Sequence, residues 1–92
     1  MQYRIKWKKK ATKALEKIQE EQRPKIIEAV KTLEDSNNWH NVRKLVNLES
    51  THRLRVGQYR VLFTADDSPG GNVIEIRDLE IDDVRKRDDR TY

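Results

Sequence analysis

The stretch that decides the fold is HRLRVGQYRVLF, residues 52–63. Apolar residues alternate with arginines over 53–56, and a second β-rich run follows over 59–63. Alternation with period two is typical of a strand that buries one face. Gly57-Gln58, between the two runs, is a connection of the length that joins the strands of a tight hairpin. Residues 52–63 are therefore predicted to form a strand, a tight turn and a second strand.

The sequence before this hairpin predicts one strand and two helices. Apolar side chains alternate with polar ones over residues 2–7, as in a strand, and from Lys8 the apolar spacing becomes helical. Pro24, which is best tolerated in a first helical turn, opens a second helical stripe, and residues 35–38 (DSNN) end it. The two apolar stripes are Ala11, Ala14, Leu15 and Ile18, and then Ile26, Ile27, Val30 and Leu33. Residues 39–50 fit neither period and are expected to form a packed loop.

The sequence after the hairpin predicts one more strand. Residues 66–71 (DDSPGG) are a strong turn signal, residues 72–76 (NVIEI) are β-rich, and residues 82–92 form a highly charged tail. The predicted fold class is α+β in a single domain over residues 1–92. An N-terminal strand and a two-helix hairpin precede three antiparallel strands, which form a small sheet with the helices on one face.

Composition narrows the function classes. Lys and Arg number 20 against 16 Asp and Glu, for a net charge of +4, which fits either a polyanion-binding protein or a solubilising surface. The chain has no cysteine and two histidines, so we expect no disulfide, no metal site and no other cofactor. No segment has the apolar length of a membrane span. We therefore expect a cytoplasmic protein without a membrane partner.

The arginines of the hairpin form the candidate site. Alternation places Arg53 and Arg55 on one face of their strand, and Arg60 can converge with them from the returning strand. A bound phosphate would offset the repulsion among these side chains by accepting paired hydrogen bonds. The alternative is that the arginines pair with Glu75, Asp78 or Glu80 on a neighbouring strand. A second basic cluster, Arg85, Lys86 and Arg87, and the aromatic Tyr92 favour binding of single-stranded RNA.

Residues 52–63 resemble the central signature of RelE-type toxins of the RelE/ParE superfamily: a basic strand, a glycine turn and a strand that opens with Tyr-Arg. The resemblance covers nearly the whole chain, including Lys44-Leu45 and the run from Lys86 through Tyr92. It implies a RelE-like fold and the toxin of a type II toxin–antitoxin system. Such a toxin is a ribosome-dependent endoribonuclease that cleaves mRNA in the A site by 2′-hydroxyl attack on the adjacent phosphate. The implied partners are a cognate antitoxin, the ribosome with its RNA, and mRNA.

The resemblance also implies roles for individual residues. Arg60 matches the arginine that stabilises the phosphate, and Tyr92 matches the tyrosine that orients the substrate. Arg53 and Arg55 stand where the best-known members have lysines, and a permanently charged arginine cannot easily accept a proton. The implied catalytic set is Arg53, Arg55, Arg60, Lys86, Arg87 and Tyr92, and the RNA-binding set is Arg53, Arg55, Arg60, Arg85, Lys86, Arg87 and Tyr92.

The general base stays open. Alternation turns His52 away from the arginines, which leaves a carboxylate from Asp78, Glu80, Asp88 or Asp89, or catalysis by positioning and charge alone. The expected structural roles are loop packing for His40, core or edge anchors for Trp7 and Trp39, and a solvated helix start for Lys8-Lys9-Lys10. Asp82-Asp83 and Asp88-Asp89 are expected to be solvated charges or partners of Arg85 and Arg90 rather than cation ligands. The alternative functions are a ParE-like gyrase inhibitor and an RNA-binding module without catalysis.

Overall fold

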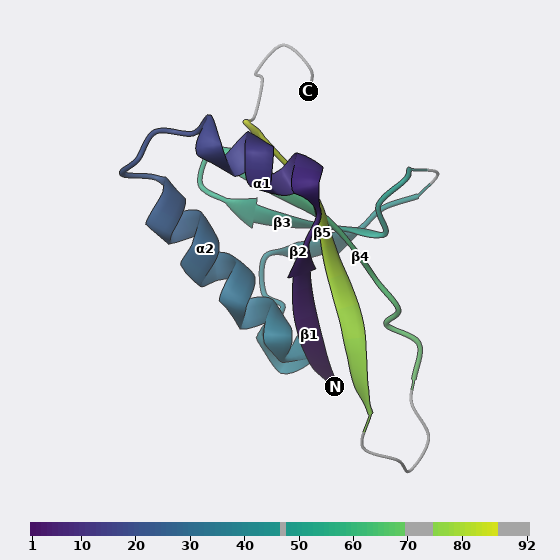
Figure 1. Cartoon of the computed structure of the whole chain (residues 1–92). Helices are drawn as coiled ribbons and strands as arrows, with labels where there is room; N and C mark the ends of the chain where they lie inside the picture. The colour runs from purple at the N-terminus through teal and green to yellow at the C-terminus, as the bar shows by residue number, and fades with distance from the viewer. Residues whose placement is uncertain (47, 70–74, 87–92) are drawn as a thin grey trace.

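A mixed β-sheet forms the centre of this computed structural model, which describes residues 1–46, 48–69 and 75–86 (Figure 1). Its five strands have the order β1-β5-β4-β3-β2. β5 pairs in parallel with β1 and antiparallel with β4, and the pairs β4–β3 and β3–β2 are antiparallel. The elements are β1 (Gln2–Trp7), α1 (Lys9–Glu16), α2 (Arg23–Lys31), the 3₁₀ helices η1 (Thr32–Glu34) and η2 (Ser36–Asn38), β2 (Val42–Lys44), β3 (His52–Val56), β4 (Tyr59–Ala65) and β5 (Ile76–Lys86).

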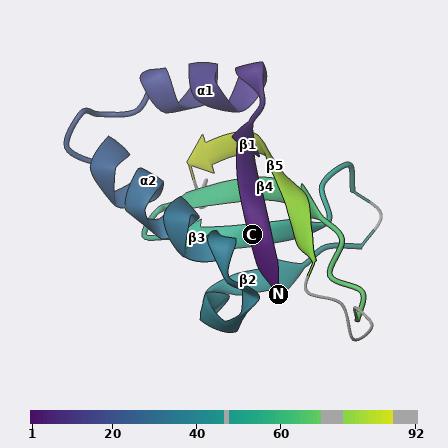
Figure 2. The same ribbon diagram turned by 60° about the horizontal axis from the view of Figure 1, so that its bottom comes forward.

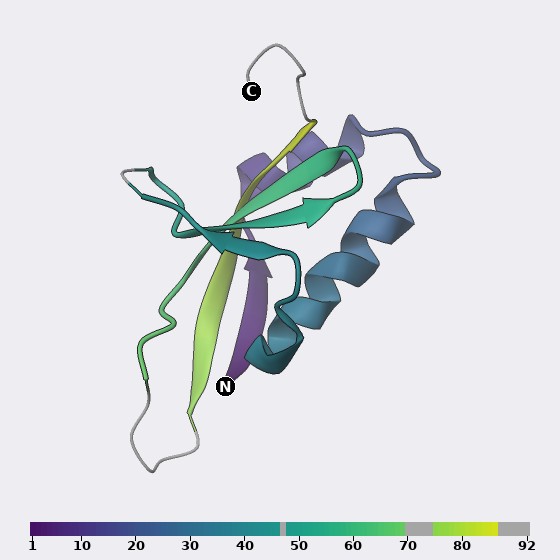
Figure 3. The ribbon, with the colours of Figure 1, turned by 180° about the vertical axis from the view of Figure 1, so that it is seen from behind.

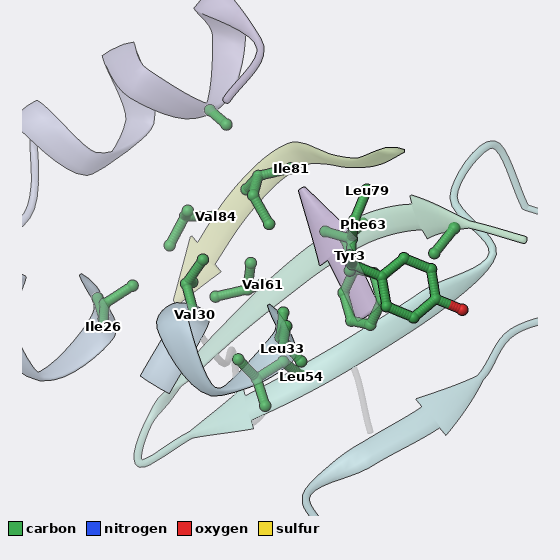
Figure 4. Close-up of a cluster of buried hydrophobic side chains, with 12 residues drawn as sticks. Tyr3, Ile26, Val30, Leu33, Leu54, Val61, Phe63, Leu79, Ile81 and Val84 are labelled. Atoms are coloured by element: carbon green, nitrogen blue, oxygen red, sulfur yellow. The ribbon is translucent and has the colours of Figure 1, made fainter. Parts of the chain in front are cut away.

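The helices cover one face of the sheet. One cluster of buried side chains joins residues of α1, α2 and η1 to alternate residues of β1, β3, β4 and β5 (Figure 4). Phe63, Ile26 and Leu33 are the largest of its fully buried members. Because successive side chains of a strand point to opposite faces, the other half of the strand residues forms a second face without helices. We call this second face the open face. Seen from behind, β3 and β4 lie in front of α1 (Figure 3).

The predicted α+β class and the predicted hairpin are confirmed. Gly57 has a φ of +56°, a left-handed conformation that glycine adopts without strain, and it turns β3 back into β4. Pro24 lies in the first turn of α2, as predicted. Ile27, which was assigned to the apolar stripe of this helix, is 37% exposed. Among the helices that the structure describes, none is long and apolar enough to cross a membrane.

Two predictions about the strands are wrong. Residues 39–50 are not loop throughout, because Val42–Lys44 form the edge strand β2, paired with β3. The last strand does not end at residue 76: β5 begins at Ile76 and runs to Lys86, so all of the described part of the supposed charged tail is strand. The rest of the predicted strand, Asn72 to Ile74, lies outside the described residues. The sheet therefore has five strands rather than four.

A β-bulge changes the direction of β5. Leu62 pairs with Asp83 while Phe63 pairs with Ile81, so Asp82 is an extra residue without a partner on β4. An extra residue bends a strand and shifts its alternation by one. Figure 2 shows that bend between the two halves of β5. As a result Ile81 and Val84, three residues apart, are both buried in the core.

Candidate functional site

Arginines from four strands line up on the open face. Cross-strand pairs place Arg60 of β4 between Arg55 of β3 and Arg85 of β5, and Arg43 of β2 beside Arg53 of β3. Directly paired residues share a face and have Cβ atoms about 5 Å apart. The register thus brings the predicted residues Arg53, Arg55 and Arg60 together and adds Arg43 to them. Arg85 joins the same face because of the bulge, since without it the alternation of β5 would turn this side chain toward the helices.

Four of these arginines line a groove, which we call the arginine groove. Its volume is about 370 Å³, and its walls are His40, Asn41, Val42, Arg43, Arg53, Arg55 and Arg60. The backbone N–H of Arg55 donates to the carbonyl of Asn41 at 2.9 Å, which fastens the segment before β2 to β3. No carboxylate lines this groove within the described residues. Guanidinium groups stay charged at all physiological pH values, so the groove is suited to a phosphate.

The carboxylates considered as alternative partners contact other cations. Asp78 lies 3.2 Å from Lys6, and Glu80 lies 3.4 Å from Lys8. Glu75 lies 3.4 Å from Arg77. None of the three lines the arginine groove. Asp78 and Glu80 are therefore not placed to act as bases there.

A buried carboxylate orients Arg85. The Nε–H of Arg85 donates to Asp83 Oδ2 at 2.9 Å, and the side chain of Asp83 is only 12% exposed. The backbone N–H of Val84 donates to the other carboxylate oxygen at 2.9 Å, which fixes the carboxylate itself. The expected partnership of Arg85 with this acidic pair is thus made by Asp83. Because the bond uses Nε, both terminal nitrogens of the guanidinium remain at its outer end.

Asp82, the bulge residue, has other partners. Its Oδ2 accepts hydrogen bonds from Ser50 and Thr64, both at 2.6 Å. Its Oδ1 lies 2.9 Å from the ammonium of Lys8, at an angle that falls short of a hydrogen bond, so this contact acts through charge. Burial acts to raise the pKa of Asp82, but the two hydroxyl donors and Lys8 outweigh it and hold the pKa below the ordinary value.

The C-terminal residues of the predicted site are only partly described. Lys86 pairs with Tyr59, so the register directs its side chain to the helix side of the sheet, whereas Arg60 points to the open face. Arg85 rather than Lys86 therefore lies beside the hairpin arginines. Arg87 and Tyr92, and the possible bases Asp88 and Asp89, lie outside the described residues.

His52 is part of the core side of the sheet, as its alternation predicted. It is 3% exposed, its ring stacks on Phe63 at 5.2 Å, and Trp39 meets it edge-on at 5.3 Å. Its Nε2 lies 3.2 Å from Asp67. Burial acts to raise the pKa of Asp67, but hydrogen bonds with Lys44 and His52 lower it below its ordinary value. Trp39 also stacks on Tyr3 at 5.1 Å, so it is a core anchor, as predicted.

Four residues that line the groove were not assigned to it from the sequence, and His40 and Arg43 are the two of them whose side chains bear on its chemistry. His40 was expected to pack in a loop, yet it is exposed and lines the arginine groove, and Arg43 lies on the missed strand β2. Both precede or belong to a three-residue strand, which is too short to show alternation. The sequence shows His40 shortly before Arg43, but only the pairing of β2 with β3 places His40 next to the arginines of the hairpin.

The architecture is that of a small α+β protein with a RelE-like fold. No protein-family model matches the chain, and no curated protein matches it. Among solved structures, the chain is similar to one from the crystal structure of the archaeal RelE–RelB complex of Pyrococcus horikoshii OT3. The TM-score is 0.70 at 24% sequence identity, and the match covers 95% of this chain and 97% of the other. This likeness shows the fold.

Proposed function

We propose that this protein is the toxin of a type II toxin–antitoxin system, and that it cuts mRNA in the ribosomal A site. The observation that carries the proposal is the arginine groove on a RelE-like fold, with four guanidiniums and no carboxylate among the described residues of its wall. A site with this charge favours a phosphodiester, and its open side admits an extended strand.

The chemistry would be attack by the RNA's own 2′-oxygen on the adjacent phosphorus. The 2′-hydroxyl loses its proton, and its oxygen forms a bond to phosphorus. The bond between phosphorus and the 5′-oxygen then breaks, and that oxygen takes up a proton from solvent, which leaves a 2′,3′-cyclic phosphate and a 5′-hydroxyl. Negative charge accumulates on the phosphorus oxygens between these events. Arg55 and Arg60 would stabilise that charge with preorganised hydrogen bonds, and Arg85 would bind a neighbouring phosphate.

His40 would accept the proton. It is the titratable side chain in the wall of the arginine groove, since the other charged groups there are arginines. Imidazole changes charge between pH 5 and 8, so it can serve as a base where guanidinium cannot. His52, by contrast, is enclosed on the core side of the sheet. Tyr92 would stack on a base, in keeping with the resemblance stated above.

An antitoxin would neutralise this toxin by covering the open face. The solved structure with the same fold is a RelE–RelB complex. An acidic segment would complement the arginines, and such binding weakens as salt rises.

The test is primer extension on a translated and an untranslated copy of one message after expression of the protein. Cleavage is expected only in the translated copy. Arg60→Ala should lower single-turnover cleavage on programmed ribosomes about a hundredfold or more, as loss of one preorganised donor does. Arg60→Lys should recover only part of the rate, because a point charge lacks the two-pronged geometry.

Lys31→Ala is the matched control, because this cation is exposed on α2, away from the groove. Its cleavage rate should equal that of the original chain. An Arg60→Ala protein with full activity would contradict the phosphate site. Intact messages together with inhibited gyrase would show a ParE-like toxin instead.

A further inference from the structure

A second concavity adjoins the arginine groove on the open face. It measures about 600 Å³, within the range of small-molecule sites. Leu62, in its wall, pairs directly with Arg53 on one side and with Asp83 on the other. Arg85 also lines it and pairs with Arg60 of the groove. The two concavities therefore lie about one strand spacing, roughly 5 Å, apart.

The wall of this second concavity combines leucines with carboxylates. Leu45, Leu48 and Leu62 supply apolar surface, and Glu49, Asp82 and Asp83 supply negative charge. Three cations, Lys8, Lys10 and Arg85, also line this wall. We call it the leucine–carboxylate pocket. Leu48 is 65% exposed, which is a large apolar surface left to solvent. The three cations offset the three carboxylates, so this pocket differs from the arginine groove beside it in its leucines and in having carboxylates in its wall.

The two aspartates of the pocket are committed to the protein itself. Asp82 accepts from Ser50 and Thr64, and Asp83 accepts from Val84 and Arg85. Glu49 is exposed, and no ion pair holds it within the described part of the chain. Glu49 is thus the carboxylate of the wall that can turn toward a ligand.

We propose that the leucine–carboxylate pocket binds a nucleobase with paired N–H donors, guanine, from the nucleotide next to the phosphate in the arginine groove. The leucines would cover the flat face of the ring, and Glu49 would accept from the base edge. Guanine presents N1–H and an amino group side by side, which matches the two oxygens of one carboxylate. Uracil presents a single N–H between two carbonyls, which a carboxylate repels. This inference rests on the proposed function only in that the chain binds RNA.

The test measures binding rather than cleavage. Two fluorescently labelled RNA decamers are compared by anisotropy with the purified chain: oligo(U), and the same oligo(U) with one internal guanosine. We expect about tenfold tighter binding of the guanosine RNA, at the lower end of what a two-bond base contact gives. In the Glu49→Gln variant, the ratio of the two affinities should fall close to one. The melting temperature of this variant should equal that of the original chain. Glu34→Gln, an exposed carboxylate on η1, is the control and should keep the ratio.

The possible outcomes separate the pocket from the proposed function. Equal affinity for both RNAs, or a guanosine preference that survives Glu49→Gln, would overturn the pocket while leaving RNA binding intact. Failure to bind either RNA at low salt would instead contradict the arginine groove as a phosphate site. A third outcome is that Leu62→Ala loses binding to both RNAs while Glu49→Gln binds both as the original chain does. The leucines would then act without a carboxylate contact, and the assignment of the pocket to guanine would be overturned.

Discussion

The two histidines of the chain lie in opposite environments, although both adjoin arginine-bearing strands. His52 is enclosed by Phe63 and Trp39 and is held at its Nε2 by Asp67. His40 is exposed in the wall of the arginine groove. Burial and fixed hydrogen bonds suit a structural role, whereas exposure next to a phosphate site suits proton transfer.

This contrast predicts a pH dependence for cleavage. Single-turnover cleavage that uses an imidazole as general base should become faster between pH 5 and 8, because only a neutral imidazole can accept a proton. The charges that face His40, on Arg43, Arg53, Arg55 and Arg60, stay constant over this range. His40→Ala should lower the rate about a hundredfold or more and flatten the profile.

Arg55→Ala is the matched control for this prediction. It should also cut slowly, through lost stabilisation of the phosphorane, but its rate should keep the same rise with pH. A His40→Ala protein that retains the rise would place the base elsewhere, and RNA binding measured alongside would show that the groove is still formed.

Single residues of the groove could be foreseen to different degrees. Alternation placed Arg53 and Arg55 on one face, and the two-residue turn allowed Arg60 to converge with them, as the register of β3 and β4 shows that it does. His40 and Arg43 could not be placed, since only the pairing of β2 with β3 brings them there. The face on which Arg85 lies depends on the bulge, and no pattern in the neighbouring sequence predicts that bulge.

At the scale of elements, the bulge of β5 has its own anchor. Asp82 ties β5 to β4 through Thr64, to the segment before β3 through Ser50, and to the start of α1 through Lys8. Its side chain is 14% exposed. Hydrogen bonds to a buried charged acceptor are among the stronger ones, so this junction should matter for stability.

Asp82→Asn should therefore destabilise the chain by ~1–2 kcal/mol at pH 7, because bonds to a charged acceptor become bonds to a neutral one. The pKa of Asp82 is lowered by folding, so its stabilising contribution is present above the ordinary carboxyl pKa and is lost as pH falls through the lower folded pKa. The difference between variant and original chain should shrink below about pH 4.

Urea unfolding at pH 7 and pH 3 measures this difference. Asp78→Asn, whose half-exposed carboxylate pairs only at the surface, should cost less than about 1 kcal/mol. An Asp82→Asn effect of equal size at both pH values would mean that the side chain acts through its shape and not its charge.

Helices and strands whose apolar residues repeat with a clear period were predicted from the sequence. Strands that lack such a repeat were missed or cut short. β1, both helices and the hairpin each repeat an apolar spacing over five or more residues, and the buried side chains follow it. β2 has three residues, and β5 combines charged residues with a bulge that breaks its alternation at Asp82. The end of β5 was for that reason taken for a charged tail.

Over the whole molecule, the cations differ in whether carboxylates lie next to them. The carboxylates of β5 contact cations of β1 and α1, among them Lys6, Lys8 and Lys10. The wall of the arginine groove contains no carboxylate within the described residues. Among the described residues, the arginine groove is thus a surface to which a polyanion would be attracted.

This distribution predicts how RNA binding depends on salt. For single strands, log K falls with log salt by about 0.7 for each phosphate neutralised. Arg43→Ala and Arg55→Ala should each reduce that slope by roughly 0.7. Arg4→Ala should leave it unchanged, because Arg4 lies on β1 and its guanidinium pairs with Asp78 at 3.8 Å. Equal slopes in all three variants would mean that the groove does not hold the phosphates.

The strand order also determines when the sheet can be completed during synthesis of the chain. β5, late in the chain, inserts between β1 and β4, and Gln2 finds its partner Ile76 across 74 positions of sequence. The hairpin of β3 and β4 can close early from local contacts, but β1 has no sheet neighbour until β5 has left the ribosome. Arg85 arrives with that same strand. A nascent chain that lacks β5 would thus have its sheet in two parts, and the complete arginine row can form only after β5 has been made.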